Sequence, residues 1–69
     1  MAYIQYIVSY LSAHDGNMII EQVFADSEAK ACMRVLEHEG FPGIKLETME
    51  EVHDLISSSG EAYIGVMEL

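Results

Sequence analysis

The stretch YIQYIVSYLSAHDGNMIIEQVFA, residues 3–25, determines most of the architecture. Residues 3–11 are rich in Tyr, Ile and Val, which favour strands, and their alternation gives one apolar face: Ile4, Tyr6, Val8 and Tyr10. Residues 14–17 (HDGN) predict a turn, because Asp-Gly and Gly-Asn supply residues that tolerate a positive φ. Residues 18–25 predict a second strand. The two strands would form an antiparallel hairpin, with the first of them central in the sheet.

A helix is expected directly after the hairpin. Asp26 or Ser27 can cap it, because the side-chain oxygen accepts a hydrogen bond from a free N–H of the first turn. Glu28 in that turn suits the positive end of the helix dipole. Apolar residues then recur at helical spacing along the buried side: Ala29, Cys32, Met33 and Leu36. Gly40 is predicted to end the helix in a left-handed conformation, and Pro42 prevents the helix from resuming.

The rest of the chain predicts a strand, a helix and a last strand. Residues 43–47 are expected to form a short strand, and residues 48–51 (TMEE) form a capping box in which Thr48 and Glu51 cap each other's backbone. A short helix would follow, with its apolar side made by Met49, Val52, Leu55 and Ile56. Residues 57–60 (SSSG) end it, and residues 61–67 alternate as the last strand.

The order ββαβαβ predicts one small α+β domain over residues 1–69. We expect a four-stranded, mostly antiparallel sheet with one main helix packed on one face and a short second helix. The other sheet face would be partly open. A domain of this size has little interior, yet the chain is 51% hydrophobic, with five Met and four Tyr. Some of these side chains must stay at the surface, which favours a homodimer or a partner-binding face.

The charge of the chain limits its partners. Twelve acidic residues against three basic ones give a net charge of −9, which repels nucleic acid and anionic membrane, so we expect direct binding to neither. It should attract a basic protein surface, and proteins that bind nucleic acid commonly have one. The chain has no apolar run of about 18 residues, no signal-peptide pattern at its start, and one cysteine. These features predict a cytoplasmic protein.

No catalytic, cofactor-binding or metal site is expected, and the protein is predicted to be non-enzymatic. Glu50 and His53 share a helix face, but a di-iron site needs a second such pair and two further glutamates. Cys32 lies in the apolar stripe without a cation to lower its pKa, so it is interpreted as a core thiol. Gly40 and Gly43 lack the spacing and the lysine of a phosphate-binding loop.

The predicted partner-binding residues are mainly acidic. The first candidates lie within eight positions, and two more precede them in the chain: Glu47, Glu50, Glu51 and Asp54, then Glu37 and Glu39. Rows of carboxylates can imitate phosphates, and complementary charge chiefly raises the association rate and selects partners. Exposed tyrosines, Tyr3 or Tyr63, would supply packing anchors. The alternative is that the acidic residues only keep the protein soluble.

The chain resembles the small proteins with which phages disable bacterial defences, notably anti-CRISPR proteins. The resemblance depends on the small acidic domain, on the hairpin over residues 3–25, and on residues 25–31 (ADSEAKA) followed by residues 43–48 (GIKLET). No functional residue can be carried over from it. It implies stoichiometric binding, in the host bacterial cell, to the nucleic-acid-binding surface of a Cascade-type complex or a Cas nuclease, which blocks DNA access. The alternative is a small homo-oligomeric structural or regulatory domain of phage or bacterial origin.

Overall fold

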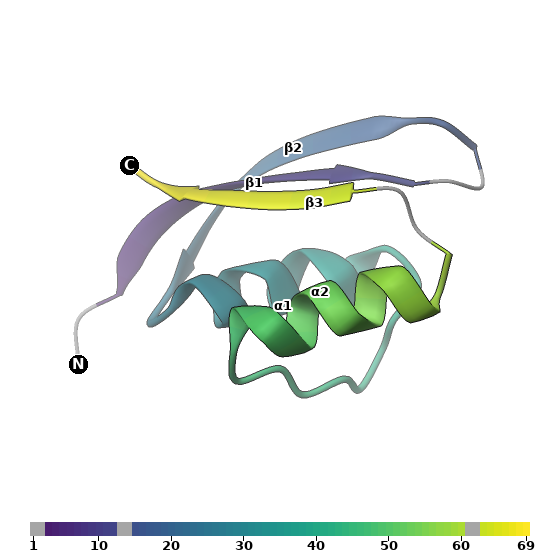
Figure 1. The fold of residues 1–69 in the computed structure, drawn as a ribbon. Helices are drawn as coiled ribbons and strands as arrows, with labels where there is room; N and C mark the ends of the chain where they lie inside the picture. The colour runs from purple at the N-terminus through teal and green to yellow at the C-terminus, as the bar shows by residue number, and fades with distance from the viewer. Residues whose placement is uncertain (1–2, 13–14, 61–62) are drawn as a thin grey trace.

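The computed structural model describes residues 3–12, 15–60 and 63–69. Three strands form one antiparallel sheet in the order β2-β1-β3, and both helices lie against the same face of it (Figure 1). The result is a two-layer α+β domain with a ββααβ element order. The bounds of the elements are β1 Ile4–Leu11, β2 Met18–Ala25, α1 Glu28–His38, α2 Met49–Ser58 and β3 Tyr63–Glu68.

The predicted four-stranded ββαβαβ arrangement is wrong. Residues 43–47 do not form a strand; they belong to the connection between α1 and α2, which runs along the side of the helices away from the sheet (Figure 1). The connection turns at Gly40 and Gly43, whose φ values are 107° and 79°, and residues 44–47 then have no strand beside them because the helices separate them from the sheet. The alternation has another cause: Leu46 is buried and Ile44 packs against the core, which anchors the connection.

The expectation of one main helix and a short second one is also wrong. The helix α1 has 11 residues and α2 has 10, and the two pack side by side in one layer. Because α1 contacts α2 as well as the sheet, its buried side is wider than a single stripe. Ala31 and Val35 are therefore buried, although the sequence pattern did not include them, and Met33 is only partly buried.

The predicted hairpin is confirmed. The strands β1 and β2 pair from Ile4 opposite Ala25 to Leu11 opposite Met18. In the connection, the Asn17 N–H donates to the Asp15 carboxylate at 3.1 Å, and Gly16 has a φ of 72°. His14, which was included in the predicted turn, lies outside the described residues.

The hydrophobic core lies between the sheet and the helices. The predicted inner face of β1 is confirmed, since Tyr6, Val8 and Tyr10 are at most 3% exposed. The central position of β1 explains this burial, because it has a strand on each side and α1 beneath it. Burying a large apolar side chain contributes about 1.5–3 kcal/mol, so these residues dominate the stability of the sheet. The rest of the core comes from all other elements: Ala25, Ala29, Ala31, Cys32, Val35, Leu36, Leu46, Val52, Ile56 and Ile64.

The predicted helix boundaries are confirmed by specific contacts. Ser27 caps α1, because its Oγ accepts a hydrogen bond from the Lys30 N–H at 3.3 Å. At the other end Gly40 is left-handed, and the Phe41 N–H donates to the Leu36 carbonyl at 3.1 Å. Among the described residues, neither helix is long and apolar enough to cross a bilayer.

Candidate protein-binding surfaces

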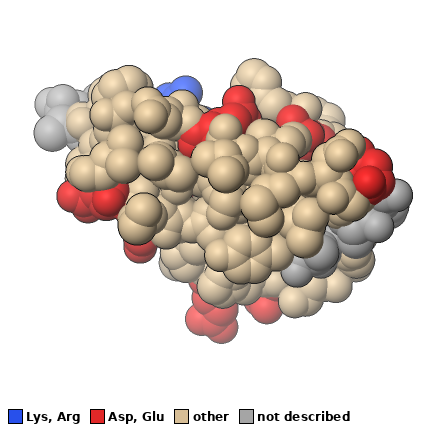
Figure 2. Space-filling view, turned by 90° about the horizontal axis from the view of Figure 1, so that it is seen from above, with Lys and Arg blue, Asp and Glu red and all other residues tan. Residues whose placement is uncertain are grey.

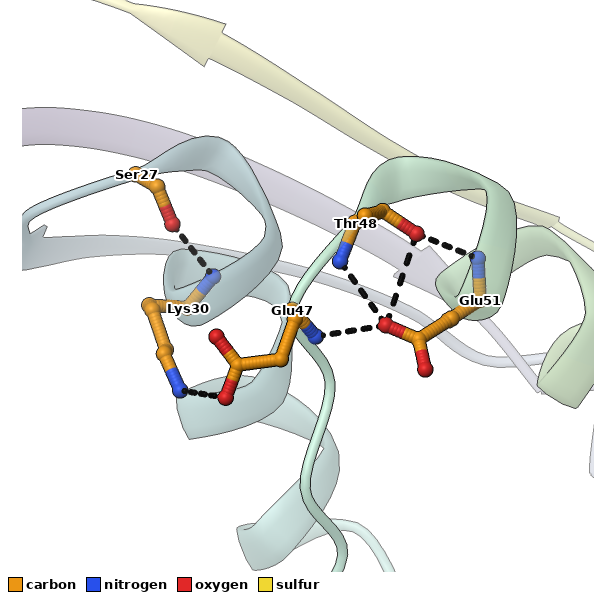
Figure 3. A network of polar contacts seen from close by, with 5 residues as sticks. All are labelled: Ser27, Lys30, Glu47, Thr48 and Glu51. Carbon is orange, nitrogen blue, oxygen red and sulfur yellow. Dashed lines mark hydrogen bonds and ion pairs between the residues drawn. The ribbon is translucent and has the colours of Figure 1, made fainter.

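The start of α2 uses the carboxylate of Glu51 as a structural group (Figure 3). One oxygen, Oε1, accepts hydrogen bonds from the backbone N–H groups of Glu47 at 2.9 Å and Thr48 at 3.0 Å. In return, Thr48 Oγ1 accepts one from the Glu51 N–H at 3.2 Å. These backbone donors hold the pKa of Glu51 below its usual range, because they stabilise the ionised form. The predicted capping box is therefore confirmed. The carboxylate of Glu51, one of the predicted partner-binding residues, is accordingly hydrogen-bonded within the protein.

Glu47 is the second predicted carboxylate with a contact inside the protein. Its Oε1 lies 3.0 Å from Lys30 Nζ, which links α1 to the residue before the cap of α2 (Figure 3). The side chain of Glu47 is 68% exposed and that of Lys30 is 29% exposed, so water screens this pair. Lys30 still neutralises part of the acidic character at this end of α2.

Glu50 and Asp54 are the predicted carboxylates of α2 that make no such contact. Both are exposed on α2, four residues apart, and α2 contains no Lys or Arg. Within the described part of the chain, neither has an ion-pair partner. Like charges at this spacing destabilise a helix by about 0.2–0.5 kcal/mol. A cation bound between them would remove that repulsion, so the pair favours a basic ligand.

Three other predicted partner-binding residues lie near α1 and not on α2: Tyr3, Glu37 and Glu39. Tyr3 is 56% exposed and lines a hollow beside α1 together with Glu37, Lys30 and Arg34. Asp26 also lines this hollow, so its rim carries charges of both signs. Glu39 follows α1 as its C-cap and is partly buried. The structure places these residues along α1, apart from the carboxylate pair of α2.

The outer face of the sheet has a different chemistry from the helix layer. On this face the register of the three strands brings together only uncharged side chains, several of them large and apolar. Seen from that side, the middle of the molecule is free of charged side chains and the acidic ones lie mainly near the margins (Figure 2). We call this surface the open face; it consists of Gln5, Ile7, Ser9, Leu11, Met18, Ile20, Gln22, Phe24, Tyr63, Gly65 and Met67.

Sequence reasoning anticipated an open sheet face and named Tyr63, which is 50% exposed on it. It missed the most exposed members, Ile20, Phe24 and Met67, which are 59–66% exposed. The alternation of residues in the two hairpin strands was sufficient to place Ile20 and Phe24 on this face. Once alternate residues of β1 are assigned to the core, antiparallel pairing places Ile20 opposite Ser9 and Phe24 opposite Gln5 on the other face.

Gly65 shapes the open face beside Tyr63. A Cβ atom built on Gly65 would collide with the phenol of Tyr63, so the Tyr63 ring lies across the glycine. Gly65 is also the pairing partner of Ser9 in the central strand. A glycine covered by a neighbouring aromatic ring is a known way to compensate for its missing side chain in a sheet. The ring therefore lies close to the sheet surface.

Cys32 is a buried thiol. It is 0% exposed, and burial raises its pKa to about 11, with a further contribution from the charge of Glu28. The thiolate, which is the nucleophilic form, is therefore rare at neutral pH. Over residues 3–12, 15–60 and 63–69 no three side chains of His, Cys, Asp or Glu are grouped to hold a metal ion.

No protein-family model matches this chain, and comparisons with curated proteins and with solved structures also found no match. Residues 43–47, within one of the stretches that suggested a resemblance to anti-CRISPR proteins, do not form the expected strand. The molecule offers two distinct surfaces to a partner: the carboxylates of α2 and the open face.

Proposed function

We propose that this protein acts without catalysis, by docking Glu50 and Asp54 of α2 onto a basic surface of another protein. The observation that carries the proposal is this exposed carboxylate pair, one helical turn apart on a helix without Lys or Arg. The net charge of −9 adds a long-range attraction for cationic surfaces. Such a field raises the association rate, and the local pair selects the orientation of docking.

The preferred class of partner is a protein that binds nucleic acid. Its Lys and Arg side chains form a surface that normally holds phosphates, and carboxylates at helical spacing can occupy the same positions. While they do so, DNA is excluded, and the protein acts as an inhibitor. The resemblance described above makes a Cas effector complex of a bacterial host the first partner to test.

The test compares two charge-reversed variants with the same net charge. Glu50→Lys with Asp54→Lys changes the α2 pair, and Glu21→Lys with Glu68→Lys changes exposed carboxylates of the outer strands. Purified Cas effector complex and labelled target DNA are mixed with each protein at low and high salt. We expect the wild type to displace DNA at low salt and the α2 variant to be at least about tenfold weaker.

The matched variant makes the result specific. If both variants lose the same activity, only the net charge matters and α2 is not the docking site. If the wild type displaces no DNA at either salt, the inhibitor proposal for this class of partner is overturned. Unchanged displacement by the α2 variant would remove Glu50 and Asp54 from the contact.

A further inference from the structure

The open face is large for a surface without a partner. Its most exposed apolar side chains are Met18, Ile20, Phe24, Tyr63 and Met67, each between 50% and 66% exposed. With a full area of roughly 200 Å² for a large side chain, these fractions correspond to about 600 Å². The largest apolar patch on a typical monomer covers about 300–600 Å². The open face is therefore at the upper limit for a monomer, on a molecule whose whole accessible surface is 4324 Å².

We propose that the open face binds a second copy of this chain, sheet against sheet, to form a symmetric dimer. A standard interface buries about 800 Å² on each partner, and the apolar side chains named above supply most of that area. The uncharged polar members of the face supply the rest. Two sheets stacked about 10 Å apart would bury these side chains as a sandwich core does.

Charge favours a second copy over other occupants. A two-fold interface brings each residue of a patch against the same patch of the partner, so a patch that contains charge of one sign repels itself. The open face contains no charged residue, although the chain has a net charge of −9. It can therefore pair with itself without burying a charge. A basic partner, in contrast, would find no carboxylate on this face.

The same geometry keeps the acidic helices apart. In a sheet-to-sheet dimer the helix layers lie on the two outer sides, with both sheets between them (Figure 1). Glu50 of one copy would then be separated from Glu50 of the other by more than twice the Debye length of about 8 Å at physiological salt. The repulsion between the two copies is accordingly weak, and it decreases further as salt is added.

The dimer is tested by sedimentation over a wide range of protein concentration, with a single charge placed on the open face. Ile20→Lys puts a cation where the second copy would bury it. Ser58→Lys makes the same change in net charge on the exposed end of α2. We expect the wild type and Ser58→Lys to dimerise equally, and the dissociation constant of Ile20→Lys to rise by at least about tenfold.

Two further measurements keep the result decisive. Phe24→Lys is a second variant of an exposed position, and circular dichroism of both variants checks that the fold is kept. Raising the salt from about 0.01 M to about 1 M shortens the Debye length from about 30 Å to about 3 Å, so the apolar dimer should become tighter. The docking of α2 onto a basic protein should weaken under the same change, which separates the two proposals.

Three outcomes would overturn the proposal. One is a wild-type protein that sediments as a monomer at every concentration and salt. Another is a dimer whose dissociation constant is unchanged by both Ile20→Lys and Phe24→Lys. The third is a dimer that dissociates at high salt, since that contact would be ionic. None of these outcomes bears on Glu50 and Asp54, which all of these variants retain.

Discussion

Lys30 Nζ and Glu47 Oε1 lie 3.0 Å apart, which joins the first turn of α1 to the connection that enters α2. Glu47 also donates its backbone N–H to Glu51. One residue thus contacts both helices, through its side chain in one direction and its backbone in the other (Figure 3). These two kinds of contact differ in strength, because the ion pair is exposed to water whereas the hydrogen bond belongs to the helix cap.

Replacing the side chain of Glu47 should have little effect on stability. The ion pair with Lys30 is exposed, and exposed pairs contribute about 0.2–1 kcal/mol. We expect Glu47→Gln to lower the free energy of unfolding in urea by less than about 0.5 kcal/mol, because the backbone N–H to Glu51 remains. A double-mutant cycle with Lys30→Met measures the coupling. A coupling above about 2 kcal/mol would contradict this assignment.

Removing the cap of α2 should have a larger effect. Thr48→Ala deletes the oxygen that accepts the Glu51 N–H, and loss of an N-cap costs about 1 kcal/mol. Thr48→Ser keeps that oxygen and is the matched control. We expect the alanine variant alone to lose stability in urea unfolding at a fixed protein concentration. Equal stability of the alanine and serine variants would show that the cap contributes nothing.

The contribution of Glu51 should depend on pH. Its pKa is lower in the folded protein than the ordinary value of 4.5, so the ionised carboxylate stabilises the fold. This contribution is complete above pH 4.5 and is lost as the pH falls through the lowered pKa. Glu51→Gln cannot ionise. We expect its melting temperature to be below that of the wild type at pH 7, and the difference to shrink as the pH falls below 4.5 through the lowered pKa of Glu51. A difference that stays constant with pH would contradict the assigned role.

The core side of α1 should be the most sensitive part of the protein. Leu36 is 0% exposed, and replacing such a leucine with alanine costs about 2–5 kcal/mol. Typical domains have only about 5–15 kcal/mol of stability in total, and small ones have less. We expect Leu36→Ala to unfold much of the protein at 37 °C by circular dichroism. Leu55→Ala, at a partly buried position on α2, is the control and should cost less than half as much.

Cys32 should react only when the protein opens. Its burial and raised pKa keep it as an inaccessible thiol. We expect a thiol reagent at pH 8 to label the native protein at least about a hundredfold more slowly than the urea-unfolded chain. Labelling at equal rates would contradict the burial of this residue.

The sequence predicted the secondary structure well where a single residue meets a specific requirement of the backbone, such as a helix cap or a positive φ. Ser27 and Thr48 begin their helices because each supplies an oxygen to a free N–H group. Gly40 ends α1 because it accepts a positive φ. The hairpin and the inner face of β1 followed from the alternation of Tyr, Ile and Val.

The tertiary arrangement was harder to predict. Ile44 and Leu46 alternate as strand residues do, but the same alternation arises when a connection anchors two side chains on a core. No local property distinguishes the two cases, since the difference depends on where α1 and α2 lie. The roles of Glu47 and Glu51 have the same origin: a carboxylate that contacts Lys30 and one that caps a helix look alike in the chain. Only their neighbours in space separate them from Glu50 and Asp54.

The position of β1 between its two partners also sets an order of assembly. Its pairing with β2 joins two strands that are neighbours in the chain. Its pairing with β3 joins Leu11 to Tyr63, which are far apart in the sequence. During synthesis the hairpin and α1 leave the ribosome before β3. Tyr10 therefore lacks its pairing partner, Ile64, until residues 63–68 emerge. Closure of the sheet, and with it completion of the core, is therefore delayed until β3 has been synthesised.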